Sequence, residues 1–483
     1  MASMQDNPDD KIIRMDKDYY ISPDLVELDE TTQNQKRAFW VENITKIKAI
    51  VAPMVDQSEL AFRMMLRQYC SDLCYSPMIH AHLFATSPGY RNQAFSTCLG
   101  DRPLIIQFCA NNADDLLTSC RLVEGLCDGV DLNLGCPQII AKKGHYGSYL
   151  QEEPELIKEM VSKVYRYCKL PLSVKIRRLG TDEETIAYAK MLEQAGATML
   201  TLHGRTREMR GTATGVADWE IIKKIKKVLS IPVIANGNIQ FPYDLDDCLK
   251  QTNADAVMSA EGILSNPYLL ANKSDYNFKI AKEYLSYAKK FESSVCAIRA
   301  HIFKICHYSL LEYVSLRDGV ATAKTIQHFY RIIDELENNI RRDNATVDFD
   351  NPDWQPSRDN QITKFHERVY NLPHYIAKPY TRPAIDDSKL ASTEFRVQRR
   401  GHLSKLAEET GLSVRFIRKI EKRKMKMPGL DPQYQAKKQY QTCVICKSPA
   451  GESCNHDLCK KCCKSKCATE DLLCTMHYKG RPC

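Results

Sequence analysis

The sequence has no run of about 18–20 apolar residues, the length that a membrane-spanning helix needs, and its mean hydropathy is −0.41. We therefore expect no membrane contact. The first 20 residues are polar and acidic, with neither the apolar core of a secretory signal nor the Arg-rich pattern of an organelle-import sequence. We expect a cytoplasmic protein and leave a nuclear pool open. In that reducing environment the 20 cysteines are expected to be thiols, metal ligands or catalysts rather than disulfides.

Two phosphate-binding motifs are also missing. No G-x-G-x-x-G follows the first apolar run, and no G-x-x-x-x-G-K-S/T occurs anywhere. The sequence therefore lends no support to a tightly held nicotinamide dinucleotide or to a P-loop nucleotide site.

Length and charge divide the chain. Its 483 residues and 55.3 kDa are enough for two or three domains. Residues 395–440 contain 13 Lys and Arg against 4 Asp and Glu, a net charge of +9, whereas the whole chain carries +8. Nine of the 20 cysteines fall in residues 443–483. We expect a flexible lead (1–40), a catalytic domain (41–274), a helical domain (275–342), a linker (343–394), a basic connector (395–440) and a Cys-rich tail (441–483).

Eight short apolar runs alternate with amphipathic, helix-sized segments. The runs lie at 48–54, 73–79, 103–110, 129–137, 172–178, 197–204, 232–239 and 254–262. They are rich in Val, Ile and Leu without strict alternation, which is typical of parallel strands buried on both faces. Eight strand–helix units predict an α/β fold, a (β/α)8 TIM barrel. A doubly wound sheet is the alternative.

The carboxyl ends of the predicted strands carry polar side chains, and in such a barrel that is where chemistry takes place. An amide, a thiol, an amine and an imidazole fall there: Gln107, Cys136, Lys175 and His203. Glycines at the ends of the last two strands expose backbone N–H groups of the kind that hold a phosphate. We therefore expect one chemical site at one mouth of the barrel.

Several motifs follow one another along the predicted barrel. They are V-D-L-N-L-G-C-P (130–137), V-K-I-R (174–177), H-G-R-T-R-E (203–208), G-V-A-D-W (215–219), A-N-G-N-I (235–239) and N-P-Y (266–268). On these motifs about half of the chain resembles the tRNA-dihydrouridine synthases, closest to the eukaryotic branch that acts on D-loop positions 16 and 17. The resemblance implies an oxidoreductase of tRNA modification, with tRNA as its partner and the helical domain as a tRNA-binding domain.

The resemblance also implies a set of FMN contacts. Those implied around the ring are Pro53, Met54, Val55, Gln107 and Lys175, and those implied around the phosphate are His203, Asn236, Gly237, Asn238, Ala260 and Glu261. His203 could contact the substrate base instead. Lys175 would lie where negative charge develops in the reduced ring. The family often has Gly-Arg-Gly where this chain has Ala260-Glu261-Gly262, so Glu261 is expected to offer only its backbone N–H, and the phosphate charge must be met elsewhere.

Cys136 is implied to be the proton donor. In the family's reaction NADPH or NADH binds transiently and reduces FMN, a hydride passes from flavin N5 to uridine C6, and a proton goes to C5. A thiol with a pKa near 8.5 is protonated at neutral pH and can give that proton up. Asn133, Arg177 and Arg205 are implied to hold the uridine, which must be flipped out of the tRNA to reach a buried flavin.

The basic connector contains two stretches of helical periodicity, at 402–424, separated by Gly411. This pattern is typical of a helix-turn-helix. A solvated amphipathic helix is the alternative. In either case the charge density suits contacts with phosphates.

The tail is dense in zinc ligands, and zinc favours four thiolates or imidazoles with pairs two to four residues apart. The candidates are Cys443, Cys446, Cys454, Cys459, Cys462, Cys463, Cys467, Cys474 and His477. About 40 residues with few large apolar side chains cannot build a core unaided, so metal would supply the folding energy. We expect one or two zinc ions. Our predicted partition pairs Cys443 and Cys446 with Cys462 or Cys463 and Cys467, and Cys454 and Cys459 with Cys474 and His477; free thiols are the alternative.

Two other functions stay open. One is a flavin-dependent dehydrogenase of the dihydroorotate or dihydropyrimidine type, and the basic connector argues against such a small substrate. The other is a non-enzymatic, zinc-bearing RNA-binding scaffold, against which the joint presence of Cys136, Lys175 and His203 argues. We expect the chain to be a monomer.

Overall fold

The computed structural model describes residues 7–15, 24–69, 71–350, 369, 371–381, 442–446, 448, 450, 454–469 and 474. The chain forms two compact units, Met1–Ala384 and Ile385–Cys483. The helix-turn-helix predicted for 402–424 and the predicted ligand His477 lie outside the described residues. Within the described part, no helix is both long and apolar enough to span a membrane.

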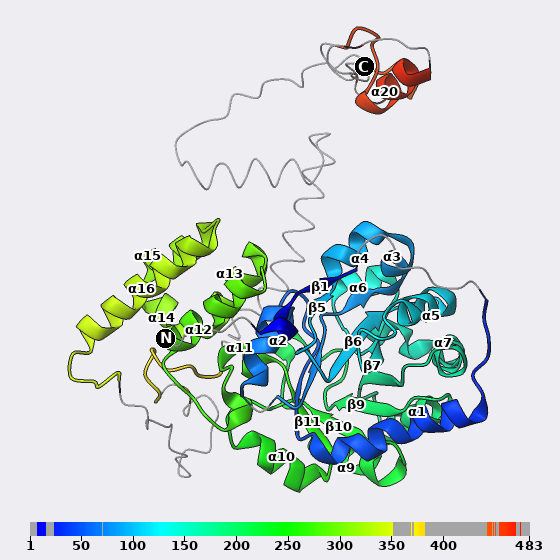
Figure 1. Cartoon of the computed structure of the whole chain (residues 1–483), viewed down its shortest axis with the longest axis horizontal. Helices are drawn as coiled ribbons and strands as arrows, with labels where there is room; N and C mark the ends of the chain where they lie inside the picture. Colours follow the sequence, from blue (N-terminus) through cyan, green and yellow to red (C-terminus); the bar gives the residue numbers. More distant parts are fainter. Residues whose placement is uncertain are drawn as a thin grey trace, which may run out of the picture. The chain divides into compact units, whose positions relative to one another are not determined.

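Eight parallel strands form a closed barrel in the first unit (Figure 1). They are β2 (Ala49–Val51), β3 (Leu73–Tyr75), β6 (Leu104–Cys109), β7 (Gly129–Leu134), β8 (Leu172–Arg177), β9 (Met199–His203), β10 (Val233–Asn236) and β11 (Ala256–Ser259). Strands β6 to β11 pair in chain order, β11 pairs with β2, and β2 pairs with β3. Pairing of Cys74 on β3 with Leu104 on β6 closes the ring. The predicted TIM barrel is therefore confirmed, and the doubly wound sheet is excluded.

Helices cover the outside of the barrel. They are α2 (Leu60–Arg67), α3 (Ala81–Thr86), α4 (Pro88–Ala94), α5 (Ala113–Leu122), α6 (Ile139–Gly144), α7 (Pro154–Tyr167), α8 (Asp182–Gln194), α9 (Trp219–Val228), α10 (Asp244–Thr252) and α11 (Glu261–Ser265). Short 3-10 helices lie at Pro8–Asp10, Ile44–Lys46, Gly147–Glu152, Gly211–Ala213 and Leu269–Ala271. Side chains cap the first turns where the sequence supplies them: Asn112 caps α5, Thr181 caps α8 and Asp218 caps α9. The strand β4 (Ile79–His80) pairs with the far end of β6.

The N-terminal segment differs from the flexible lead expected for residues 1–40. Helix α1 (Glu30–Asn43) packs across the base of the barrel, where Trp40 is 1% exposed and belongs to a buried cluster with Tyr75 and Met199. Lys36 donates hydrogen bonds to the carbonyl oxygens of Tyr165 and Cys168, both at 2.6 Å, at the end of α7. Strand β1 (Ile13–Arg14) pairs antiparallel with β5 (Ser96–Thr97). The described part of this lead is thus built into the barrel unit.

A group of helices follows the barrel. They are α12 (Asn277–Lys290), α13 (Val295–Ile305), α14 (His307–Glu312), α15 (Val314–Thr322) and α16 (Ile326–Asp343). Glu59, at the start of α2, joins them to the barrel because it accepts hydrogen bonds from Tyr284 (2.8 Å) and His301 (3.0 Å). Residues 371–381, expected to be linker, return to these helices, where Ile376 bridges to Tyr276. The apolar periodicity of α16 predicted a helix. No sequence pattern predicted that residues 371–381 pack against these helices.

Candidate active site

The carboxyl ends of β8, β9, β10 and β11 surround a cavity of about 280 Å³. Eight of the residues predicted to bind FMN or tRNA line it: Arg177, His203, Arg205, Asn236, Gly237, Asn238, Ala260 and Glu261. Pro137 and Gln138, which directly follow Cys136, line it too. Cys136 is not itself a lining residue, but it directly precedes this part of the cavity wall, just after the end of β7.

Lys175 projects from β8 into this region. Its Nζ donates a hydrogen bond of 2.9 Å to Oδ1 of Asn236, and Nδ2 of Asn236 donates to the carbonyl oxygen of Met258 at 2.8 Å. Burial, and then the positive charge of Arg177, lower the pKa of Lys175 to about 8. An anion bound beside Lys175 would hold the ammonium in its charged form.

His203 is held as a neutral imidazole. Burial, together with the charges of Lys175, Arg177 and Arg205, keeps the pKa of His203 well below its usual value. Nη1 of Arg205 lies 3.1 Å from Nε2 of His203. A guanidinium can only donate, so Nε2 accepts and the ring proton sits on Nδ1. The ring is thus fixed in one tautomer at the wall of the cavity.

The turn after β10 is shaped for close approach. Gly237 has a φ of +115° and Asn238 a φ of +63°. An ideal Cβ on Gly237 would lie only 2.6 Å from Cβ of Ala217. The side chain of Asn238 is fixed in turn, because its Oδ1 accepts from Nη2 of Arg205 (2.7 Å) and from the N–H of Ala217 (2.9 Å). A backbone without a Cβ and with a guanidinium beside it suits a phosphate group.

Glu261 opens the short helix α11, with Ala260 as its N-cap. Gly262 follows where a Cβ would lie 2.2 Å from the carbonyl oxygen of Ile239. The turn therefore needs glycine at 262. The positive charges around the cavity that this turn lines come not from β11, the eighth strand of the barrel, but from Arg177, Arg205 and Arg210.

Gln107 is fixed by a carboxylate that sequence reasoning missed. Nε2 of Gln107 donates to Oδ2 of Asp131 (2.8 Å), and Oε1 of Gln107 accepts from Nδ2 of Asn133 (2.9 Å). Ser173 donates to the other oxygen of Asp131 at 2.6 Å. Burial raises the pKa of Asp131 to about 6. One signal was available: Asp131 and Asn133 are two residues apart on one strand and therefore face the same side.

The backbone of Cys136 is held from two sides. Its N–H donates to Oδ1 of Asn133 (2.9 Å), and its carbonyl oxygen accepts from the hydroxyl of Ser148 (2.9 Å). Gly147 has a φ of +68°, and a Cβ there would lie 2.8 Å from the Cys136 carbonyl oxygen. Burial raises the pKa of the Cys136 thiol, against the opposing effects of Arg177 and Lys175. The thiol is therefore protonated at neutral pH and remains partly accessible.

Arg177 donates its hydrogen bonds to carbonyl oxygens of the protein backbone. Nε donates to the carbonyl oxygen of Gly135 (2.9 Å) and Nη1 to that of Thr206 (2.8 Å). Burial and the neighbouring Arg205 lower its pKa to about 10. Arg177 thus ties the Cys136 loop to the loop that follows His203, and its charge faces the thiol from within the protein.

The β2–α2 loop carries the remaining predicted contacts. Pro53 and Met54 are partly exposed at the end of β2, whereas Val55 is 56% exposed and lines a separate cavity of about 690 Å³ beside α4 and the α12–α13 turn. Ser58 holds the backbone N–H of Met54 at 3.1 Å. The structure therefore places Val55 at a different cavity from the one that eight of the predicted residues line.

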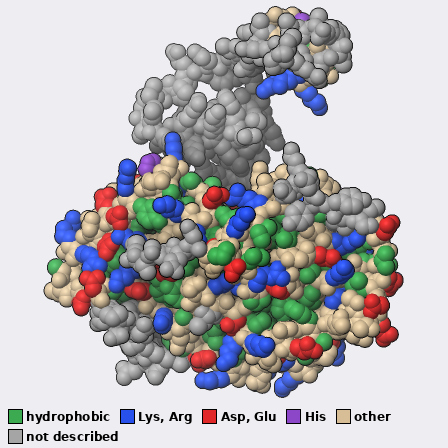
Figure 2. All heavy atoms as spheres, in the orientation of Figure 1, with side chains coloured by type: hydrophobic (Ala, Val, Ile, Leu, Met, Phe, Trp, Pro, Cys, Tyr) green, Lys and Arg blue, Asp and Glu red, His purple; other side chains and the backbone are tan. Residues whose placement is uncertain are grey.

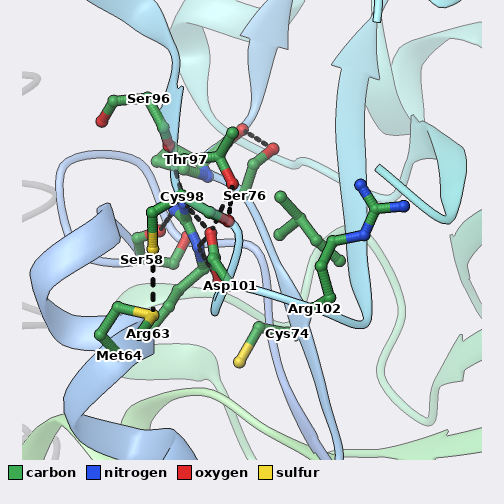
Figure 3. A network of polar contacts seen from close by, with 12 residues as sticks. Ser58, Arg63, Met64, Cys74, Ser76, Ser96, Thr97, Cys98, Asp101 and Arg102 are labelled. Carbon is green, nitrogen blue, oxygen red and sulfur yellow. Dashed lines mark hydrogen bonds and ion pairs between the residues drawn. The ribbon is translucent and has the colours of Figure 1, made fainter. Parts of the chain in front are cut away.

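A buried ion pair anchors this loop (Figure 3). Nη1 of Arg63 donates to the carbonyl oxygen of Ser58 at 2.6 Å, and Nη2 pairs with Asp101 at 2.6 Å. Arg63 is 1% exposed and Asp101 is fully buried. Thr97 also donates to Asp101, at 3.1 Å. Because breaking a buried pair is costly, the network holds the loop rigidly next to the mouth of the barrel.

The comparisons agree with this geometry. A family model described as dihydrouridine synthase (Dus) matches residues 50–349. The chain belongs to the dihydrouridine synthase family. Membership implies the use of a flavin and NAD(P)H, and it sets aside both the free-pyrimidine dehydrogenase and the non-enzymatic scaffold.

Curated relatives cover most of the chain. A Mus musculus protein named tRNA-dihydrouridine(16/17) synthase-like is 37% identical over 443 residues, which are 91% of this chain and 89% of the relative. The Saccharomyces cerevisiae tRNA-dihydrouridine(16/17) synthase is 40% identical over 71% of this chain and 85% of its own length. A Homo sapiens protein named tRNA-dihydrouridine(20a/20b) synthase-like is 34% identical over 60% of this chain.

The Cys-rich unit groups its thiols differently from the predicted partition. The sulfur atoms of Cys443, Cys446, Cys459 and Cys462 lie within 4.8 Å of one another, and so do those of Cys454, Cys463 and Cys474. Cys459 therefore joins the first group rather than the second, and Cys463 joins the second. Cys467 lies 3.8 Å from Cys463, on the helix α20 (Lys460–Thr469).

Proposed function

We propose that this protein reduces the C5=C6 bond of uridine to 5,6-dihydrouridine in the D-loop of tRNA, at positions 16 and 17. One observation carries the chemistry: Cys136, whose thiol is protonated and partly accessible, directly precedes Pro137 and Gln138 in the wall of a cavity that arginines and a neutral histidine also line. The relatives named for positions 16 and 17 support the choice of uridine.

FMN fits the residues of this site. Gly237 and Asn238 form a left-handed backbone turn in the cavity wall, and the guanidinium of Arg205 binds Asn238 beside it and brings a positive charge to the site of a phosphate. Arg205 thus supplies the charge that Glu261 cannot. Gln107 and Lys175 would hold the ring, the first in an orientation set by Asp131 and the second through its ammonium. When bound, FMN supplies the hydride for C6, and NADPH or NADH supplies its electrons.

Cys136 holds on its Sγ the one proton that the reduction adds, at C5, beside the hydride added at C6. Its raised pKa keeps that proton in place until charge develops on the substrate, and the thiol then gives it to C5. The thiolate left behind is stabilised by Arg177 and Lys175, the two cations that lower its pKa. Asn133 positions the thiol by accepting from its backbone N–H. A positioned acid of this kind contributes about 10²–10⁴-fold to rate.

The proposal is tested by mapping dihydrouridine in tRNA from cells that lack the protein. Positions 16 and 17 should carry unmodified uridine, and expression of the intact chain should restore the modification. Dihydrouridine retained at both positions would overturn the proposal. Loss at other D-loop positions alone would overturn the choice of uridine and leave the reaction type intact.

A further inference from the structure

The spacing of the tail sulfurs distinguishes a metal site from disulfides. Sγ of Cys446 lies 3.6 Å from Sγ of Cys459, and Sγ of Cys474 lies 3.9 Å from Sγ of Cys454. A disulfide needs about 2.05 Å. Four sulfurs at about 2.3 Å from a tetrahedral zinc ion lie about 3.8 Å from one another. These separations therefore match the edges of a coordination tetrahedron with sulfur atoms at its corners.

We propose that the tail binds two zinc ions in two interleaved, all-cysteine sites. The first site is the group of four that the structure assembles. Its ligands are Cys443, Cys446, Cys459 and Cys462. The second site takes the other three clustered thiols and Cys467 as its fourth ligand. Its ligands are Cys454, Cys463, Cys467 and Cys474.

Helix α20 explains why the sites divide neighbouring residues. Cys463 and Cys467 are four residues apart and share one face, and both are fully buried. Cys462 precedes Cys463 directly, so it points about 100° away around the helix and reaches the other site. One short helix thus supplies ligands to both ions, and Cys467 takes the place that the sequence pattern assigned to His477.

The order of the ligands interlocks the two sites. Cys454 of the second site lies in the chain between Cys446 and Cys459 of the first. Among the described tail residues, Leu458 is the one buried aliphatic side chain larger than alanine. With so little apolar surface to bury, the metal–sulfur bonds must replace the core. Loss of either ion therefore removes the support for the other.

Metal binding also changes the charge of the tail. Residues 441–483 carry seven basic and four acidic side chains, a net +3. Each zinc ion with four thiolates adds a charge of about −2, so the loaded tail carries about −1. Lys460, Lys461 and Lys464 are exposed on α20, beside the thiolates. Figure 2 shows basic side chains on the surface of the described part of the tail. These lysines offset the two anionic centres, and contacts with RNA phosphates fall to the basic residues of 395–440.

The test is the metal content of the purified full-length protein, measured by elemental analysis. We expect two zinc ions per chain in the wild type and fewer than one in Cys446→Ser and in Cys467→Ser. The matched control is Cys296→Ser, because this cysteine is exposed on α13 and belongs to neither group; it should keep two ions. Circular dichroism checks that the variants retain their helices.

Three results would overturn the proposal. Zinc content of one ion or none in the wild type would remove the second site. A variant that loses one ion and keeps the other would show that the sites are independent. If His477→Ala lost zinc while Cys467→Ser kept two ions, His477 and not Cys467 would be the fourth ligand of the second site. Replacing zinc with cobalt gives a second measurement. The intensity of the sulfur-to-cobalt charge-transfer absorption should correspond to four thiolates per ion.

Discussion

Replacing Gly237 with alanine adds one methyl group at the turn that we assign to the FMN phosphate. The backbone there has a φ of +115°, which a residue with a Cβ rarely adopts. The new Cβ would lie 2.6 Å from Cβ of Ala217 and 3.0 Å from Cδ2 of His203, whereas carbon atoms pack at about 3.5–4.0 Å. We expect the turn after β10 and the His203 ring to move apart.

The size of the effect follows from these two conflicts. The backbone conformation costs about 1–3 kcal/mol, and the overpacked contact costs about 1–3 kcal/mol more. If about 1.4–2.8 kcal/mol of this appears in cofactor binding, FMN should bind 10- to 100-fold more weakly. The assay removes the flavin from the full-length protein and titrates FMN back, following its fluorescence, with thermal unfolding measured in parallel.

Gly89→Ala is the matched control. Gly89 is the second residue of α4, and nothing lies within 4 Å of a Cβ built on it. We expect unchanged FMN affinity and a stability gain of at most about 0.5–1 kcal/mol, the preference for alanine in the middle of a helix. If Gly237→Ala bound FMN as tightly as the wild type and melted at the same temperature, the close packing of this turn would have no part in the cofactor site.

Three further predictions concern charge and packing. In the wild type, flavin reduction by NADPH should slow at a pH above about 8, because the Lys175 ammonium, whose pKa is about 8 without ligand and rises when an anion binds beside it, is lost there. In Lys175→Ala reduction should be slow throughout, and a pH step that survives would exclude Lys175. The folded-state pKa of Asp131 is about 6 against an ordinary 3.8, so burying its charge costs stability above pH 6 and nothing below about pH 4. Asp131→Asn should therefore gain up to about 3 kcal/mol relative to the wild type as pH rises through this window, measured by urea unfolding, and a falling difference would contradict the assignment. Trp40→Ala should destabilise the barrel by about 3–5 kcal/mol, whereas Trp40→Phe should cost less because the Trp40 Nε1 is buried without a partner; equal losses in a melting experiment would contradict the packing account.

The barrel could be predicted because its strands are encoded locally. Each apolar run is short, buried on both faces and bounded by turn residues, and the predicted runs all contain observed strands. The polar residues at the strand ends could be placed for the same reason, since parallel strands bring their ends together. For this reason the sequence analysis could place His203 and Asn236 at the same mouth of the barrel.

Contacts that depend on distant parts of the chain could not be predicted. Lys36 binds carbonyl oxygens about 130 residues away, and no local pattern announces this. Asp131 was hidden inside an apolar run, although its carboxylate fixes Gln107. In the tail, close sequence spacing suggested which cysteines share a metal, but helix geometry separates Cys462 from Cys463. In each case the deciding information is the position of a partner in space.

The proton donor is the central claim, and single-turnover oxidation tests it most directly. Enzyme reduced beforehand with NADPH is mixed with unmodified tRNA, and the flavin absorbance is followed. Cys136→Ala should accept electrons from NADPH at the wild-type rate, and its oxidation by tRNA should slow by about 10²–10⁴-fold. Cys109→Ala, which removes a buried thiol on β6, should oxidise like the wild type. Oxidation of Cys136→Ala at the wild-type rate would contradict the account, and the proton would have to come from another group at the cavity.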